Sequence, residues 1–222
     1  MITRLPRWVE YGAFLLAFIA GTINAIGLLG IDHQSVSHLS GTATLFGTKL
    51  LTSPLSKSLH LAGVIASFFI GSAISGFVLK SSSLKLKRHY EIPLLLEALL
   101  IFITLYLLTT DSGYGDFTAS MACGLQNAMV TTYSGAVVRT THLTGIITDL
   151  GLMFGHYLRG ESINKRKLIL FSLISLGFIF GGTVGALLFN AILFHALLLP
   201  GVLCVLIALC YRYYVKTHPD IE

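Results

Sequence analysis

The chain has 222 residues, of which 54% are hydrophobic and only 11% are charged. This composition excludes a soluble domain, and uncharged runs such as 11–31 and 168–194 are long enough to cross a bilayer. The formal net charge of +5 does not indicate a nucleic-acid partner, because the basic residues cluster in short loops beside apolar segments. Anionic lipid headgroups and topology control explain that placement better, so the expected partner is the lipid bilayer.

Apolar residues form eight segments in chain order, which we predict to be helices. Their approximate ranges are 9–30, 38–53, 59–79, 92–109, 115–135, 143–158, 168–190 and 192–214. The second and sixth segments are short and rich in Gly, Ser and Thr, so we expect re-entrant or broken helices there. The predicted fold is an all-α integral membrane protein, a single domain over residues 1–222 with six spanning helices plus two short re-entrant helices.

One motif occurs twice. Residues 38–47 read His-Leu-Ser-Gly-Thr-Ala-Thr-Leu-Phe-Gly, and residues 142–151 read His-Leu-Thr-Gly-Ile-Ile-Thr-Asp-Leu-Gly. Each copy follows a Gly-x-x-Asn-Ala element, at 21–25 and at 124–128. The chain is therefore predicted to be an internal duplication, with repeat one at about 9–110 and repeat two at about 114–215.

Small residues extend the repeat into the third segment of each half. Ser67, Gly71 and Ser75 match Gly177, Gly181 and Gly185, and the spacing of four residues places each trio on one helix face. Such a face lets helices approach closely, so we interpret both trios as packing surfaces rather than ligand contacts. The same faces would also permit a homodimer.

The distribution of basic residues decides the predicted topology. With six spanning helices and a cytoplasmic N-terminus, 13 of the 15 Lys and Arg residues lie inside, against 10 if all eight segments cross. The positive-inside rule favours six spanning helices, with both termini in the cytoplasm. Three spans in each half make the second repeat inverted, a plan typical of transporters. The first apolar run resembles a signal peptide, but it contains the first Gly-x-x-Asn-Ala copy and is expected to be retained.

The two short segments contain the candidate binding residues. Ser or Thr caps a helix start, and a helix start within the membrane presents N–H donors and a partial positive charge. Two such starts meeting near the midplane would favour an anion or the carboxylate of a zwitterion. Tight packing is the alternative for the small residues. For the two asparagines, the alternative is an interhelical hydrogen bond or a bond that braces the neighbouring re-entrant segment. The candidate substrate-binding residues are Asn24, Ser40, Gly41, Thr42, Thr44, Asn127, Thr144, Gly145 and Thr148.

Two acidic residues lie well inside apolar segments, where carboxylates are costly and often functional. Asp149 has no acidic counterpart, since Leu45 holds its place in the first copy, and Arg139 is its expected ion-pair partner. A purely structural role is the alternative for both acids. The candidate coupling or gating residues are Asp149, Arg139, Glu97, His38 and His142. No metal or cofactor is expected, because neither the histidines nor Cys123, Cys204 and Cys210 follow a metal-binding spacing.

Several stretches together resemble a known family. They are 124–128 (Gly-Leu-Gln-Asn-Ala), 138–141 (Val-Arg-Thr-Thr), 144–145 (Thr-Gly), 148–151 (Thr-Asp-Leu-Gly) and 94–99 (Leu-Leu-Leu-Glu-Ala-Leu). They resemble the YoaK-like bacterial membrane proteins, a family of unknown function. The first repeat departs from the family pattern, which has Asp at Asn24 and Thr-Gly-Asn at Ser40-Gly41-Thr42. The resemblance implies a bacterial cytoplasmic-membrane protein and supplies no substrate.

The leading hypothesis is a small secondary transporter or permease, not an enzyme. It would carry a small polar or anionic solute by alternating access between the inverted repeats. Two alternatives stay open. One is an intramembrane enzyme that acts on a lipid or small molecule through Asp149, His142 or Glu97. The other is a non-transporting sensor or partner subunit.

Overall fold

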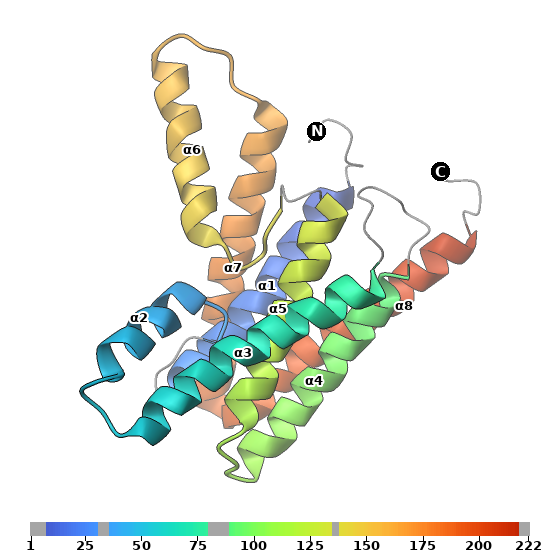
Figure 1. The fold of residues 1–222 in the computed structure, drawn as a ribbon. Coiled ribbons are helices and arrows are strands. Elements are labelled where there is room, and N and C mark those ends of the chain that lie inside the picture. The colour runs from blue at the N-terminus through green and yellow to red at the C-terminus, as the bar shows by residue number, and fades with distance from the viewer. Residues whose placement is uncertain (1–7, 31–35, 80–88, 135–137, 218–222) are drawn as a thin grey trace.

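The computed structural model describes residues 8–30, 36–79, 89–134 and 138–217, and this part of the chain contains helices and turns but no strand (Figure 1). The helices are α1 (Trp8–Gly30), α2 (Leu39–Lys49), α3 (Leu55–Val78), α4 (Glu91–Thr109), α5 (Gly115–Ser134), α6 (Leu143–Leu158), α7 (Lys165–Ile192), the short 3₁₀ helix η2 (Leu193–Leu197) and α8 (Leu198–Thr217).

The eight predicted segments agree with the observed helices to within a few residues at most ends. The clearest difference is at the last segment, where η2 precedes α8. Leu193 has a φ of 52°, a left-handed conformation that a leucine rarely adopts, and it ends α7. The helix α2 is also shorter than predicted and ends at Lys49.

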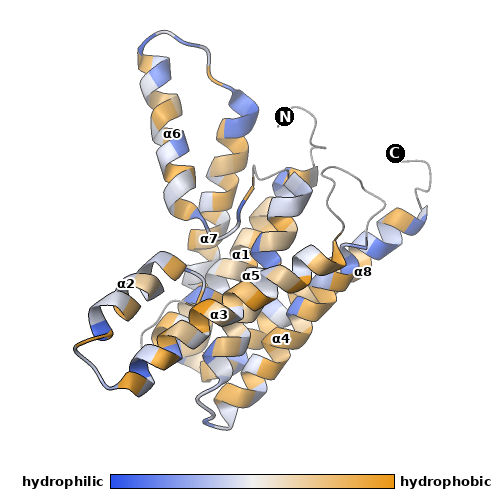
Figure 2. Cartoon of the chain, in the orientation of Figure 1, coloured by the Kyte–Doolittle hydropathy of each residue, from blue (hydrophilic) through white to orange (hydrophobic). Residues whose placement is uncertain are grey.

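Four stretches of the described chain are apolar and long enough to cross a membrane. They are Val9–Gly30, Leu55–Val78, Glu91–Thr109 and Lys165–Thr217, the last of which contains both α7 and α8. Figure 2 shows apolar residues along the outer helices α3 and α4. The twenty-residue helix α5 is not among the four, because it carries polar residues such as Asp116 and Gln126. Most of its residues are buried against α3, α4 and α1, so it does not need an apolar outer surface. The predicted all-α, membrane-type fold is confirmed.

The helix α1 crosses α7 at van der Waals distance between the two backbones. A Cβ added at Gly21 would overlap the carbonyl oxygen of Phe178, and one added at Gly181 would overlap that of Phe18. The Thr22 hydroxyl donates to the carbonyl oxygen of Phe18 within α1. It also lies 3.0 Å from the carbonyl oxygen of Gly181 on α7, within hydrogen-bonding distance. Glycines at the crossing therefore let the helices approach closely, which confirms the packing interpretation of the second small-residue trio.

The helix α3 crosses α5 in a matching way. A Cβ at Gly71 would overlap the carbonyl oxygen of Met121, and one at Gly124 would overlap that of Phe68. The Ser72 hydroxyl donates to the carbonyl oxygen of Gly124 at 3.0 Å. Gly124 holds the place in the second motif that Gly21 holds in the first. Each crossing thus joins a helix of residues 9–110 to a helix of residues 114–215, and the two halves of the chain are interlocked.

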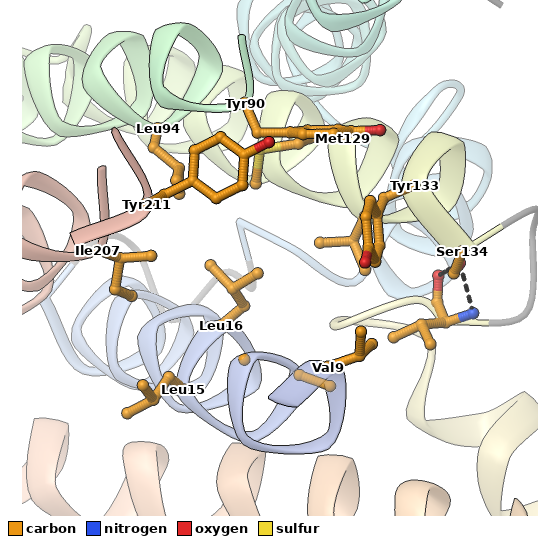
Figure 3. A pocket seen from close by; sticks show the side chains of 14 residues that line it. Val9, Leu15, Leu16, Tyr90, Leu94, Met129, Tyr133, Ser134, Ile207 and Tyr211 are labelled. Atoms are coloured by element: carbon orange, nitrogen blue, oxygen red, sulfur yellow. Dashed lines mark hydrogen bonds between the residues drawn. The ribbon is translucent and has the colours of Figure 1, made fainter. Parts of the chain in front are cut away.

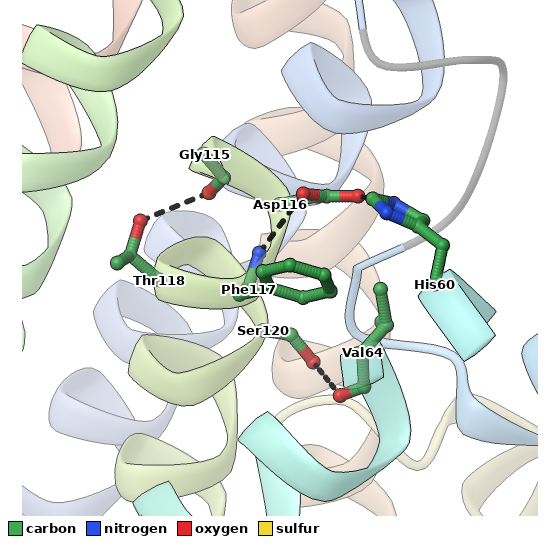
Figure 4. Close-up of polar contacts among 7 residues, drawn as sticks. All are labelled: His60, Val64, Gly115, Asp116, Phe117, Thr118 and Ser120. Carbon is green, nitrogen blue, oxygen red and sulfur yellow. Dashed lines mark hydrogen bonds and ion pairs between the residues drawn. The ribbon is translucent and has the colours of Figure 1, made fainter. Parts of the chain in front are cut away.

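Each crossed pair is also joined near one end of the bundle. The end where α1 begins and α8 ends is called the terminal end below. There, Arg166 of α7 donates to Glu10 of α1, with 2.9 Å between Nε and Oε1. At the opposite end, His60 of α3 contacts Asp116 of α5, and one turn deeper Ser120 donates to a backbone carbonyl of α3 (Figure 4).

The helices α2 and α6 lie outside these crossed pairs. Both begin near the middle of the bundle and run in opposite directions, α6 toward the terminal end and α2 toward the opposite end (Figure 1). The helix α2 packs on α3 and α6 packs on α7, but α2 and α6 do not contact each other. Thr42 is the buried residue of α2 and Ile146 that of α6.

Candidate functional site

The start of α2 is held by an amide side chain of α1. The Asn24 Oδ1 atom accepts hydrogen bonds from the Ser37 backbone N–H at 3.3 Å and from the Ser37 hydroxyl at 2.7 Å. The next residue, His38, packs its ring edge-on against the Phe178 ring of α7, with 5.4 Å between centroids. Burial lowers the pKa of His38 from its ordinary value, which favours a neutral imidazole. The bracing role that was the alternative for Asn24 is therefore observed.

The chain that leads into α6 is held by a different amide. The Gln126 side chain donates to the carbonyl oxygen of Leu16 at 3.0 Å, and its Oε1 atom accepts from the Thr140 hydroxyl at 3.3 Å. The backbone N–H of Val138 donates to the Ser134 hydroxyl oxygen at 2.8 Å. Because Gln126 is fully buried, it links α5, α1 and the segment before α6 away from solvent.

The two asparagines of the repeated motif thus differ in their surroundings. The Oδ1 atom of Asn127 is buried and makes no hydrogen bond within the described residues, whereas that of Asn24 binds Ser37. Gln126 takes the bracing role in the second copy, and the matching position in the first copy is Ile23. Gln126 was not among the predicted residues, although it lies inside the Gly-x-x-Asn-Ala element, because it occupies one of the two variable positions of that element.

The helix starts differ in detail from the prediction. His38 and His142 are the N-cap residues, and neither side chain bonds to the first N–H groups of its helix. Ser40 and Thr42 lie in the first turn of α2, so the expected Ser or Thr cap is not observed. In α6, a Cβ at Gly145 would overlap the ring of His142, which folds over this glycine. Neither N-cap side chain therefore caps the N–H donors of its helix start, the end at which the helix dipole favours negative charge.

The remaining candidate residues of these two helices are mostly exposed. The Thr44 hydroxyl donates to the carbonyl oxygen of Ser40, and the Thr148 hydroxyl donates to that of Thr144, each at 2.9 Å. All four residues are exposed, as is Gly41. The two copies of the motif therefore have matching local structures, with their hydroxyl groups bonded within the helix.

Asp149 forms an ion pair with a different residue from the one expected. Its Oδ2 atom lies 3.2 Å from Nζ of Lys167 in the first turn of α7, and Arg139 is exposed. Residues 165–167 read Lys-Arg-Lys, so one turn of α7 provides Lys167 to α6 and Arg166 to Glu10 of α1. Glu97 lies apart from both helix starts, fully buried on α4. The predicted residues thus occupy four places: α2 with Asn24 at its start, α6 with the segment before it, Asn127 on α5, and Glu97 in the core on α4.

Two pockets open at opposite ends of the bundle. An apolar pocket of about 110 Å³ lies between α1, α4, α5 and α8 near the terminal end. Tyr90, Tyr133 and Tyr211 form one wall of it, and the Tyr90 ring meets the other two edge-on (Figure 3). A more polar pocket of about 230 Å³ at the opposite end contains Asp111, His60 and Asp116.

These features define an all-helical protein of the membrane type, in which one sequence motif occurs twice and helices of the two halves of the chain cross. A family model described as "Protein of unknown function (DUF1275)" matches residues 12–210, and the chain belongs to this family. The expected membership of an uncharacterised family is confirmed, while the YoaK name stays a prediction. No curated protein and no solved structure gives a significant match.

Proposed function

We propose that the chain is a small secondary transporter or permease for a small polar or anionic solute. The observation that carries the proposal is the pair of helices α2 and α6. They contain the two copies of the repeated motif, begin near mid-bundle at histidines whose side chains make no cap hydrogen bond, and run toward opposite ends. Discontinuous helices with their N-termini at mid-membrane are a recurrent way to bind anionic groups in transporters.

The proposal includes six spanning helices, α1, α3, α4, α5, α7 and α8, with α2 and α6 re-entrant from opposite faces. The halves would then be inverted repeats in a bacterial cytoplasmic membrane, with both termini and the α6–α7 turn in the cytoplasm. The charge distribution supports this orientation. A homodimer stays a prediction.

The crossings suggest which parts move. Because glycine contacts tie α1 to α7 and α3 to α5, one repeat cannot rock against the other without separating both backbone contacts. The moving bodies in our proposal are therefore α1, α7 and α6 on one side and α3, α5 and α2 on the other. The ion pair between Asp149 and Lys167 would keep α6 with the first body.

A thermal-shift screen of the purified protein tests the proposal. A ligand that binds the folded protein raises its unfolding temperature by mass action, so at least one member of an anion, amino-acid and nucleobase panel should stabilise it. The same compound should cross the membrane of proteoliposomes that contain the protein. Absence of any stabilising compound together with absence of flux would contradict the proposal, and turnover of a lipid or solute would favour the enzyme alternative.

A further inference from the structure

A carboxyl group lies in the apolar core, apart from the starts of α2 and α6. Glu97 of α4 has 0% of its surface exposed, and its two carboxyl oxygens make no hydrogen bond with an oxygen or nitrogen atom of the described chain. Two thiols interact electrostatically with this carboxyl group, that of Cys123 on α5 and that of Cys204 on α8. Both thiols are buried in the same hydrophobic cluster of the core.

The described surroundings of Glu97 provide no positive charge. The histidine of η2, His195, is exposed, and His60 of α3 is engaged by Asp116 at the far end of α5. An ionised carboxylate in such surroundings would be strongly disfavoured, because neither a cation nor a set of donors replaces its hydration. The carboxyl group is therefore neutral in this conformation, which means that it holds a proton.

Glu97 lies between the tyrosine pocket and the polar pocket described above. Leu94, a lining residue of the tyrosine pocket, precedes Glu97 by three residues, which is about 4.5 Å of helix rise. On the other side, Asp116 of the polar pocket precedes Cys123 by seven residues of α5, about 10 Å. The buried carboxyl group thus lines neither pocket, and about one helical turn separates it from the tyrosine pocket.

We infer that Glu97 is the proton-carrying residue of the transporter and that the coupling ion is a proton. This inference rests on the proposed function. The carboxylic acid would release its proton to water when the bundle opens toward one pocket, and the carboxylate would take up a proton when the bundle opens toward the other. An anion of charge −1 that moves with this proton carries no net charge, so the membrane potential does not oppose the cycle.

Infrared difference spectroscopy tests proton binding without a substrate. The spectrum of the wild-type protein minus that of Glu97→Gln at neutral pH should contain the C=O band of a protonated carboxylic acid. The matched control is Glu91→Gln, which removes an acid of the same helix that pairs with His89. Carboxylate bands in the Glu97 difference spectrum would overturn the inference. If Glu97→Gln does not fold, Cys204→Ser should shift the same acid band, and an unshifted spectrum would overturn it.

Proteoliposomes test the coupling, with the panel compound that stabilises the protein most as the probe. Wild type and Glu91→Gln should accumulate this compound when a proton gradient is imposed. Glu97→Gln should lose accumulation but keep exchange of labelled for unlabelled compound, because exchange needs no change of protonation. Accumulation by Glu97→Gln at the wild-type level would overturn the role of Glu97.

Exchange without proton-driven accumulation in wild type would overturn proton coupling and leave transport standing. If wild type moves nothing, the proposed function and the coupling both fail.

Discussion

Two glycines of helix α1 differ in what an added methyl group would meet. At Gly21 the methyl group would overlap the carbonyl oxygen of Phe178, whereas at Gly12 it has no neighbour within 4 Å. We expect Gly21→Ala to destabilise the protein by roughly 1–3 kcal/mol, since the backbone of α7 must move away. Gly12→Ala should be neutral or stabilising by up to about 1 kcal/mol through helix propensity. Thermal unfolding in detergent measures both, and equal effects would contradict the crossing.

Two neighbouring amides of α5 make a second contrast at the scale of the residue. Gln126→Met keeps the volume of the side chain but leaves the buried Thr140 hydroxyl without its acceptor, at a cost of about 1–3 kcal/mol. Asn127→Ala removes an Oδ1 atom that bonds to no described group, so it should lower the unfolding temperature less.

The variant that loses less stability, Asn127→Ala, should lose more ligand binding, and Gln126→Met should do the reverse. Asn127 is one of the candidate substrate-binding residues, so Asn127→Ala should reduce the thermal shift that the best panel compound produces. Gln126→Met should keep most of that shift. An unchanged thermal shift in Asn127→Ala would assign this asparagine a purely structural role.

At the scale of the element, the sequence predicts nearly all helices and their approximate ends, because long apolar runs and Gly-rich short segments are distinct patterns. The small-residue trios predict close crossings, but a face of glycines does not specify its partner. That α1 packs on α7 and α5 on α3 follows only from the three-dimensional structure. The predicted ion pair between Asp149 and Arg139 was wrong. Arg139 is nearer in sequence, but the first turn of α7 brings Lys167 beside Asp149 of α6.

The re-entrant assignment of α2 and α6 makes a prediction about the turns. With six spanning helices, cysteines introduced at Thr52 and Ser112 should react with a membrane-impermeant maleimide added outside intact cells. A cysteine at Ser162 should react only after permeabilisation. The background is Cys210→Ser, because the other two native cysteines are buried.

The alternative in which all eight segments cross differs at two of these positions. It places Thr52 and Ser112 inside, while Ser162 stays inside in both arrangements and serves as the control. Protection of Thr52→Cys and Ser112→Cys in intact cells would therefore contradict the re-entrant assignment. Ser82 lies outside the described residues, and with six spanning helices a cysteine introduced there should be protected in intact cells.

At the scale of the whole molecule, the crossed pairs and the side-chain contacts that join them indicate two bodies. Each body contains helices from both predicted repeats. Glu10 and Arg166 join one pair at the terminal end, and His60 and Asp116 join the other at the opposite end. Gln126 bridges the bodies, since it belongs to α5 and bonds to Leu16 of α1. In our proposal, the alternating opening would occur at the interface between these two bodies.

Distances between spin labels test this division. Tyr11 on α1 and Leu187 on α7 are exposed and belong to one body, whereas Tyr11 and the exposed Phe77 on α3 belong to different bodies. In the Cys210→Ser background, the distance between labels at 11 and 187 should stay constant between acidic and alkaline buffer, and with or without the best panel compound. The distance between labels at 11 and 77 should shift or broaden, because domain motions leave packed pairs intact. A change confined to the first pair would show that the sequence repeats, rather than the crossed pairs, are the moving bodies.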